Sequence, residues 1–316
     1  MQWLKNEMRD EPARGPTRAA GHDAPRDVAP EQANKGHIHV RDLSIRFGDA
    51  ATGTEAVSNV SMEVQPGEFV SVIGPSGCGK STLLNAVAGF IRPTSGTLRV
   101  DGVPVEKPGA DRGVVFQQYS LFPWMTVRAN VEFGLKVRGV SKFQREGAAR
   151  TLLGLAGLLS FENHYPAQLS GGMKQRVGIV RALATSPQVL LMDEPFGALD
   201  AQTRVVMQQI LTNMWQKFRI SVLFITHDID EAVFLSDRIY VMTARPGTIK
   251  AVIPIPLRRP RTTDMATSNV YLDLKKRILE LIREESLKAM GGELKDGGLT
   301  GFGMDVGPQG VTDKLA

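Results

Sequence analysis

Two glycine-rich stretches of this chain have the composition of anion-binding loops. The first is GPSGCGKST, residues 74–82, in which a lysine and two hydroxyl side chains follow three glycines. The second is LSGGMKQR, residues 169–176, which combines a serine and two glycines with two basic side chains. Glycines let the backbone N–H groups of a loop turn toward one anion, and phosphate is a common ligand of such loops. The chain therefore has two candidate phosphate-binding loops, although one nucleotide needs only one.

The first loop matches the pattern GxxxxGK[ST], which is expected to follow a strand and open a helix. The apolar run FVSVI precedes it and LLNAVAG follows it, so both flanking elements are predicted. We predict a nucleotide-binding loop consisting of Gly74, Pro75, Ser76, Gly77, Cys78, Gly79, Lys80, Ser81 and Thr82. In such a loop the lysine reaches the β- and γ-phosphates and the serine hydroxyl binds Mg²⁺. We accordingly expect a catalytic role for Lys80 and a metal-binding role for Ser81.

Cys78 is the single cysteine of the chain and lies inside this loop. One cysteine cannot form an internal disulfide or a multi-cysteine metal site. A helix N-terminus lowers the pKa of a thiol, so a reactive cysteine is one interpretation. We favour the other, in which Cys78 is a small residue that fits the loop and has no catalytic part.

A pair of acids follows a second apolar run, VLLMDEP, residues 189–195. A carboxylate at the end of a buried strand beside the first loop would support the metal, and its neighbour would act as general base on the attacking water. We assign these roles to Asp193 and Glu194. A solvated turn or a helix cap is the alternative for an acidic pair at a strand end.

The elements that position these residues alternate between strand and helix. FVSVIG, VLLMDEP and SVLFITHD read as strands buried on both faces of a parallel sheet. A helix is predicted over residues 201–218, with Val205, Leu211, Met214, Trp215 and Phe218 on one face. Such alternation indicates an α/β domain with right-handed crossovers. HIHVRDLSIRF alternates as an edge strand does, AVSNVSMEV reads as a second strand, and residues 118–175 read as a helical insertion.

The termini and the composition indicate the domain organisation, the partners and the location of the protein. Residues 1–36 are predicted to be a disordered leader, residues 261–290 a helical extension and residues 291–316 a disordered tail. The extension has a stripe of Tyr271, Leu274, Ile278, Leu281 and Ile282. A net charge of +5 without a dense basic block does not point to nucleic acid. Neither a secretory signal nor an apolar run of about 18 residues is present, so we expect a cytoplasmic protein that reaches a membrane through a partner.

Six motifs in order resemble the ATP-binding cassette ATPases of ABC transporters: GPSGCGKST, Gln117 after a short apolar strand, LSGGMKQR, VLLMDEP, GALD and ITHD. The resemblance covers residues 37–260. It implies an α/β fold of the P-loop NTPase type, with a RecA-like core, an N-terminal antiparallel β subdomain and a helical signature-motif subdomain at about residues 118–175. It also implies ATP and Mg²⁺ as ligands.

The family resemblance implies a purpose for the second loop. In these ATPases two cassettes meet head to tail, and Ser170, Gly171 and Gly172 would bind the γ-phosphate of a nucleotide held by the partner. Asp200, in GALD, would lie at the dimer interface. The chain would therefore pair with a copy of itself or with a homologue.

Three further roles follow from the resemblance. Gln117 would contact Mg²⁺ or the attacking water, and His227 would hydrogen-bond the γ-phosphate. Phe47 would stack on adenine, although an ordinary apolar strand residue is the alternative there.

Three features indicate a class of transporter: YVMTARPGTIKAVIPIPLRRPR at residues 240–261, the LFPWMTV segment, and the helix ending at residue 290. Together they resemble the ATPase subunits of nitrate, sulfonate and taurine importers, which work with a membrane permease and a periplasmic binding protein. The apolar segment from Leu121 to Met125 would receive the permease, or would fold into the chain's own core. For LRRPR we favour a solvated surface over contact with acidic lipid. The chain would act at the cytoplasmic face of the inner membrane.

Other functional classes remain to be weighed. An importer of another solute, or a soluble ABC ATPase outside transport, is the alternative within the family, although the second class needs a coiled-coil insertion or a second cassette. A P-loop GTPase would carry NKxD, whereas residues 34–37 read NKGH. A small-molecule kinase would carry a lid, and neither class uses LSGGMKQR.

Overall fold

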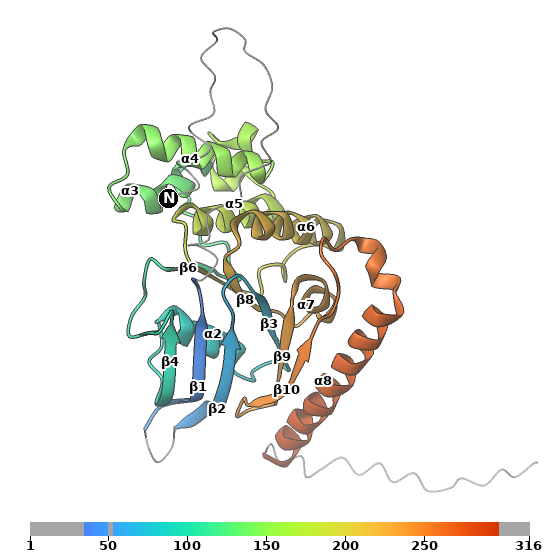
Figure 1. The fold of residues 1–316 in the computed structure, drawn as a ribbon. Coiled ribbons are helices and arrows are strands. Elements are labelled where there is room, and N and C mark those ends of the chain that lie inside the picture. The colour runs from blue at the N-terminus through green and yellow to red at the C-terminus, as the bar shows by residue number, and fades with distance from the viewer. Residues whose placement is uncertain (1–34, 50–52, 297–316) are drawn as a thin grey trace, which may run out of the picture.

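The computed structural model describes residues 35–49 and 53–296. The leader predicted for residues 1–36 and the tail predicted for residues 291–316 lie outside the described residues, except for residues 35–36 and 291–296. Figure 1 shows a body built from two sheets, with helices gathered at one end and a long helix along one edge.

The central sheet has six strands in the order β10-β9-β3-β8-β7-β6, and the strands from β9 to β6 are parallel. Its three inner strands β3, β8 and β7 are buried over nearly their whole length, which is why their sequences do not alternate. The strands are β3 (Phe69–Ile73), β6 (Arg112–Val115), β7 (Val189–Asp193), β8 (Ser221–Ile225), β9 (Arg238–Met242) and β10 (Ile249–Pro254).

The second sheet is antiparallel and has the order β2-β1-β4-β5. Its strands are β1 (Ile38–Phe47), β2 (Thr54–Val64), β4 (Ser95–Val100) and β5 (Val103–Pro104). β1 bonds to β2 on one side and to β4 on the other, so the prediction of an edge strand is wrong. Its alternation arises because one face is buried and the other is solvated. Helix α2 (Lys80–Ala88) contacts strands of both sheets, and a shared apolar core joins them.

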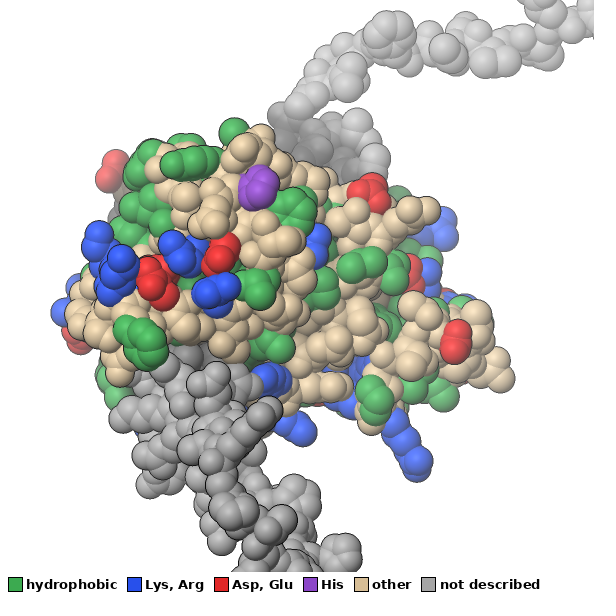
Figure 2. Space-filling model, turned by 90° about the horizontal axis from the view of Figure 1, so that it is seen from above, with side chains coloured by type: hydrophobic (Ala, Val, Ile, Leu, Met, Phe, Trp, Pro, Cys, Tyr) green, Lys and Arg blue, Asp and Glu red, His purple; other side chains and the backbone are tan. Residues whose placement is uncertain are grey.

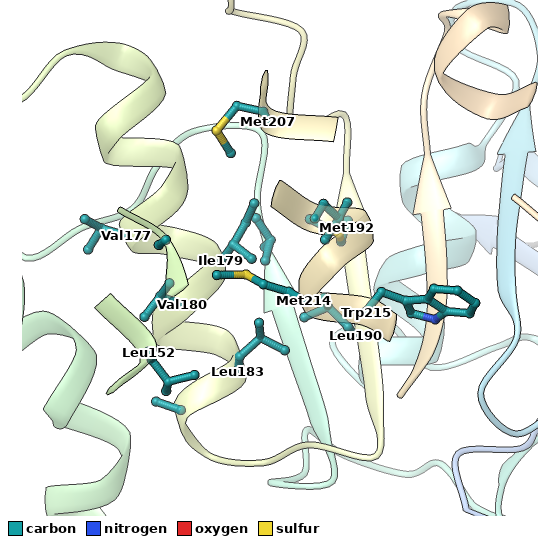
Figure 3. Close-up of a cluster of buried hydrophobic side chains, with 14 of the residues drawn as sticks. Leu152, Val177, Ile179, Val180, Leu183, Leu190, Met192, Met207, Met214 and Trp215 are labelled. Carbon is teal, nitrogen blue, oxygen red and sulfur yellow. The ribbon is translucent and has the colours of Figure 1, made fainter. Parts of the chain in front are cut away.

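The opposite face of the central sheet is covered by α5 (Gly171–Ala184), α6 (Ala201–Phe218) and α7 (Ile229–Leu235). Figure 3 shows side chains of α5 and α6 meeting those of β7 in this core. The predicted bounds of α6 are confirmed, but Val205 is 47% exposed and Met207 is buried instead. The reason is helical geometry, because Met207 lies four and seven residues before Leu211 and Met214, whereas Val205 lies six before Leu211.

The helical insertion consists of α3 (Val127–Val137), α4 (Lys142–Leu155), η1 (Leu159–Phe161), η2 (Pro166–Gln168) and the start of α5. Hydroxyl side chains of Thr126, Ser141 and Ser170 cap α3, α4 and α5 by accepting a backbone N–H in the first turn. α5 continues to Ala184, nine residues past the predicted end of the insertion at 175, and so connects it to the central sheet.

The chain ends in η3 (Thr263–Thr267) and α8 (Asn269–Asp296). The predicted stripe of α8 packs against α7, β9 and β10, with Tyr271 and Ile278 fully buried. The helix continues six residues past the boundary predicted at 290, through Gly291 and Gly292, because two glycines weaken a long helix without ending it. Across the described parts of the chain, none of the helices is both long enough and apolar enough to cross a membrane.

The LRRPR stretch is structural, so the prediction of a solvated or lipid-facing surface is wrong for two of its arginines. Arg261 is 1% exposed and donates to the carbonyl oxygens of Val233, Phe234 and Ser236 near the end of α7. Arg259 stacks on Trp215, with its guanidinium carbon 4.1 Å from the ring centroid. These contacts join the segment before α8 to α6 and α7.

Candidate functional site

A cleft of about 530 Å³ lies where the carboxyl ends of β3, β7 and β8 meet β1 and β2. The carboxyl edge of parallel strands is where ligands bind in α/β folds. The cleft is lined by Phe47, Thr54, Ala56, Ser76, Gly77, Gly79, Lys80, Ser81, Thr82, Glu194, His227 and Arg245.

The predicted phosphate loop runs from the end of β3 into the start of α2. Gly77 and Gly79 have positive φ angles of 73° and 97°, and a Cβ at Gly79 would lie 2.6 Å from the carbonyl oxygen of Ala56. These two positions therefore require glycine. The Lys80 side chain is folded into the loop, where its ammonium group donates to the carbonyl oxygens of Gly74 and Pro75 at 2.9 Å.

Cys78 is fully buried beneath the loop, and its sulfur lies 3.8 Å from the Lys80 ammonium group. Burial raises the pKa of the Cys78 thiol, while the nearby Lys80 charge opposes that effect. A raised pKa keeps the thiol protonated and unreactive. The environment thus favours the packing interpretation of Cys78.

Asp193 ends β7 beside the first turn of α2. The Ser81 hydroxyl donates to the Asp193 carboxylate at 3.0 Å. Burial raises the pKa of Asp193 and the hydrogen bond from Ser81 lowers it. Within the described residues no cluster of three or more His, Cys, Asp or Glu could hold a metal alone. One carboxylate and one hydroxyl still suit Mg²⁺, which commonly takes one or two protein carboxylates together with substrate phosphates.

The Glu194 carboxylate contacts two other predicted site residues. The Gln117 amide donates to its carboxylate at 3.4 Å, and Nδ1 of His227 lies 3.2 Å from the same oxygen. Glu194 has a φ of 43°, an unusual backbone conformation for a non-glycine residue and one often found at functional sites. This carboxylate lies in the cleft that contains the phosphate loop.

A buried polar network supports the His227 segment from behind. Thr226 donates to Glu231 at 2.6 Å, and the Thr226 hydroxyl accepts the backbone N–H of Asp228. Arg204 of α6 donates to Asp228 at 2.9 Å and to the carbonyl oxygen of Leu199 at 3.1 Å. This arginine therefore connects the GALD turn to the segment that carries His227.

Phe47 lies at the end of β1, and 47% of its surface is exposed in the cleft. An apolar strand residue in the core would be buried, so this position leaves the ring face accessible to a planar ligand.

The second glycine-rich loop lies elsewhere in the same chain. None of Ser170, Gly171 and Gly172 is among the described residues that line the cleft. Ser170 caps α5, and a Cβ at Gly172 would lie 2.5 Å from a methyl group of Thr203 in α6. Asp200 caps α6 by accepting from the Thr203 backbone, and this bond lowers the pKa of Asp200. The second loop and Asp200 therefore meet at the start of α6.

The apolar segment from Leu121 to Met125 is partly buried. Phe122 packs on Phe133 and lies under Arg181, whereas Trp124 is 70% exposed. Asn130 holds the segment with one accepted and three donated hydrogen bonds to backbone atoms of residues 122–126. Seen from this helical end, the surface carries hydrophobic side chains among basic and acidic ones (Figure 2).

Thr54, Ala56 and Arg245 also line the cleft, and none of them was predicted from the sequence. Thr54 and Ala56 lie on β2, and nothing in an alternating strand marks them as site residues. Arg245 follows β9, a parallel neighbour of β3. A basic residue directly after a strand of the parallel sheet is a signal that could have identified it.

Comparisons with known proteins agree with this geometry. A sequence profile of the family described as ABC transporter matches residues 57–197. An uncharacterized ABC transporter ATP-binding protein of Methanocaldococcus jannaschii is 48% identical over 264 residues, which cover 84% of this chain and 98% of that protein. The nitrate import ATP-binding protein NrtD of Synechocystis is 54% identical over 70% of this chain and 83% of its own length. The taurine import ATP-binding protein TauB of Yersinia pestis is 52% identical over 62% of this chain and 77% of its own length.

Solved structures of ATP-binding cassettes are also similar to this chain. An ATP-binding cassette in a dimeric, post-hydrolysis state with ADP and Pi has a TM-score of 0.62 and 33% identity, and the match covers 70% of this chain and all of that one. CbiO1 of Clostridium perfringens, part of the transporter complex cbiONQ, has a TM-score of 0.65 and 25% identity, covering 81% of this chain and 99% of that one.

Proposed function

Since the chain belongs to the ABC transporter family, we propose that it is the ATP-hydrolysing subunit of an importer for a small anionic solute of the nitrate, sulfonate and taurine class. The observation that carries the proposal is the convergence of Lys80, Glu194 and His227 on one cleft with the phosphate loop, whose Ser81 donates to Asp193. The nitrate and taurine import relatives support the solute class.

The predicted site residues have separate tasks in this reaction. The backbone N–H groups of the phosphate loop and Lys80 bind the phosphates of ATP, and Phe47 stacks on adenine. Ser81, Asp193 and Gln117 would hold Mg²⁺, which neutralises charge on the phosphates. Glu194 accepts a proton from the attacking water. His227 is held beside Glu194, at 3.2 Å, and hydrogen-bonds the γ-phosphate.

The second loop acts on the nucleotide of a partner cassette. Ser170, Gly171 and Gly172 do not reach the cleft of their own chain, and the positive end of α5 begins at them. A second copy turned head to tail brings its loop onto the γ-phosphate, with Asp200 at the interface. ATP then contacts two chains in the closed pair and one in the open pair, and this difference drives closure.

The remaining partners are those of an importer. The segment from Leu121 to Met125, with Trp124 exposed, is the contact surface for a membrane permease. A periplasmic binding protein delivers the solute to that permease, and the chain works at the cytoplasmic face of the inner membrane. We assign no role to nucleic acid.

Uptake of labelled solutes by cells tests the transport function. Deletion of the gene in its own organism should abolish uptake of labelled taurine or nitrate, and the wild-type gene should restore it while Glu194→Gln should not. Normal uptake of nitrate, taurine and alkanesulfonates after deletion would refute the solute class. If the deletion strain then lost the uptake of a different solute, that solute would be the one transported.

Turnover by the purified chain tests the chemistry. Glu194→Gln should lower the rate of ATP hydrolysis by about 100-fold or more, because it removes the general base. Lys80→Ala should weaken nucleotide binding as well as turnover. If Glu194→Gln retained the wild-type rate, the general-base assignment would be wrong.

A further inference from the structure

Arg245 reaches the nucleotide cleft from an unexpected side. It lies in the loop of residues 243–248 that joins β9 to β10, here named the 243–248 loop. β9 is a parallel neighbour of β3, so this loop leaves the sheet at the same edge as the phosphate loop. The Arg245 side chain lines the cleft together with Lys80, Ser81 and Glu194.

The Arg245 guanidinium group lies against the phosphate loop. Its Nε donates to the carbonyl oxygen of Gly77 at 3.3 Å, and a Cβ at Gly77 would lie 3.5 Å from its terminal nitrogen Nη2. Among the residues that the structure describes, the guanidinium has no ion-pair partner. A guanidinium has five N–H donors and stays charged at any pH at which proteins fold. The cleft thus contains a second permanent positive charge besides Lys80.

The 243–248 loop is fixed in position by its glycine. The Gly247 N–H donates to the carbonyl oxygen of Ala56, and its own carbonyl accepts from Ser58, so the loop bonds to β2. A Cβ at Gly247 would lie only 2.0 Å from the carbonyl oxygen of Cys78. The loop backbone therefore packs directly on the phosphate loop, and a shift of one would move the other.

Helix α8 holds the other end of this loop. The backbone N–H of Ala244 donates to the Glu285 carboxylate at 3.1 Å. Glu285 is 3% exposed and also accepts from Lys250 and Lys288, at 2.7 and 2.8 Å. Its neighbour Glu284 contacts the same two lysines but has no contact with the loop in the described structure, and its side chain is 57% exposed. Glu285 and Glu284 thus share their lysine partners and differ in the contact with the 243–248 loop, so Glu284 is a matched control for Glu285.

We propose that Arg245 binds the phosphate chain of the nucleotide, and that Glu285 of α8 is a positioning residue that holds the 243–248 loop for this contact. The inference rests on the proposed function, since it assumes that the cleft binds ATP. A guanidinium binds phosphate oxygens through short charge-assisted hydrogen bonds, often two in parallel. The C-terminal helix, which lies outside the phosphate loop and the signature motif, thereby sets nucleotide affinity.

Calorimetric titration with MgADP tests the contact, because ADP occupies the phosphate loop without turnover. Arg245→Ala should raise the Kd by about 10- to 100-fold, the effect expected for a lost hydrogen bond to a charged group. Arg245→Lys should have a smaller effect because it keeps the charge without the planar fork. Arg245→Gln repeats the test at nearly unchanged length. If Arg245→Ala and Arg245→Gln bind MgADP as tightly as the wild type while Lys80→Ala does not, the Arg245 contact is refuted and the proposed function stands. If the wild type itself does not bind MgADP, the proposed function fails.

A double-mutant cycle tests the positioning role of Glu285. Glu285→Ala should raise the Kd at unchanged stoichiometry, whereas Glu284→Ala, the matched control, should leave the Kd as it is. Adding Glu285→Ala to Arg245→Ala should cause little further loss if Glu285 acts through Arg245. A lowered stoichiometry with unchanged Kd would indicate a misfolded fraction and would refute positioning. Additive losses would refute it too.

Discussion

Replacing Glu231 by glutamine should change how the stability of the chain depends on pH. Glu231 is 3% exposed on α7, where Thr226 donates to it and the Arg204 Nε lies 3.5 Å from its carboxylate. Burial raises the pKa of Glu231 from its usual 4.5 to about 7, with Asp228 adding to the effect and Thr226 and Arg204 opposing it. Glutamine keeps the size and the acceptor for Thr226 but cannot ionise.

The direction in which stability changes with pH follows from the raised pKa of Glu231. The folded chain binds the Glu231 proton more tightly than the unfolded chain does. The stabilisation that results is complete below pH 4.5 and is lost as the pH rises through about 7. The full loss is about 3 kcal/mol, because one pKa unit corresponds to about 1.4 kcal/mol. For a chain of this size that is a difference in melting temperature on the order of 5 °C.

Thermal unfolding of both proteins from pH 5 to pH 8.5 measures the effect. Glu231→Gln should melt close to the wild type at pH 5 and several degrees above it at pH 8.5. Arg204→Lys, which keeps a positive charge facing the same carboxylate, serves as a control that retains the pH dependence. A melting difference that is constant across this range would refute the reasoning, since a neutral and an ionisable side chain would then behave alike.

Substitutions at three other residues have defined outcomes. Gly247→Ala should lower both the melting temperature and the affinity for MgADP in titration, because its Cβ would lie 2.0 Å from the Cys78 carbonyl oxygen. Asn130→Leu should cost about 2–4 kcal/mol and expose residues 122–126 to limited proteolysis, because it leaves several part-buried backbone groups without partners. Phe47→Ala should weaken MgATP binding about tenfold in a binding titration, whereas Phe47→Trp should preserve it.

Local sequence signals were sufficient for strands that are buried on both faces and for the helix with a clear apolar period. FVSVI, VLLMD and SVLFI read correctly as inner strands because such strands lack alternation. The bounds of α6 agree with the prediction from its apolar period, which ends at Phe218. Glu194 and His227, from VLLMDEP and ITHD, line the same cleft as the phosphate loop, because the ends of neighbouring parallel strands meet at one edge.

Contacts that depend on tertiary packing could not be predicted in this way. Alternation in β1 indicates one solvated face, and it carries no information about whether the strand has one neighbour or two. Arg259 and Arg261 read as surface charges because only the folded chain brings Trp215 and the carbonyl oxygens of α7 to them. The distance of Arg245 from Gly77 is likewise set by the pairing of β9 with β3, although its position after a strand of the parallel sheet marks it as a candidate.

In the proposed function, the loop LSGGMKQR completes the ATP site of a partner chain. The most direct test is the molar mass of Glu194→Gln by light scattering on a sizing column, with and without MgATP. We predict a monomer without nucleotide and a dimer with it. Adding Ser170→Glu, which places a negative charge at the exposed start of α5, should prevent the dimer without abolishing ATP binding. A Glu194→Gln protein that binds ATP and remains a monomer at all concentrations would contradict the account.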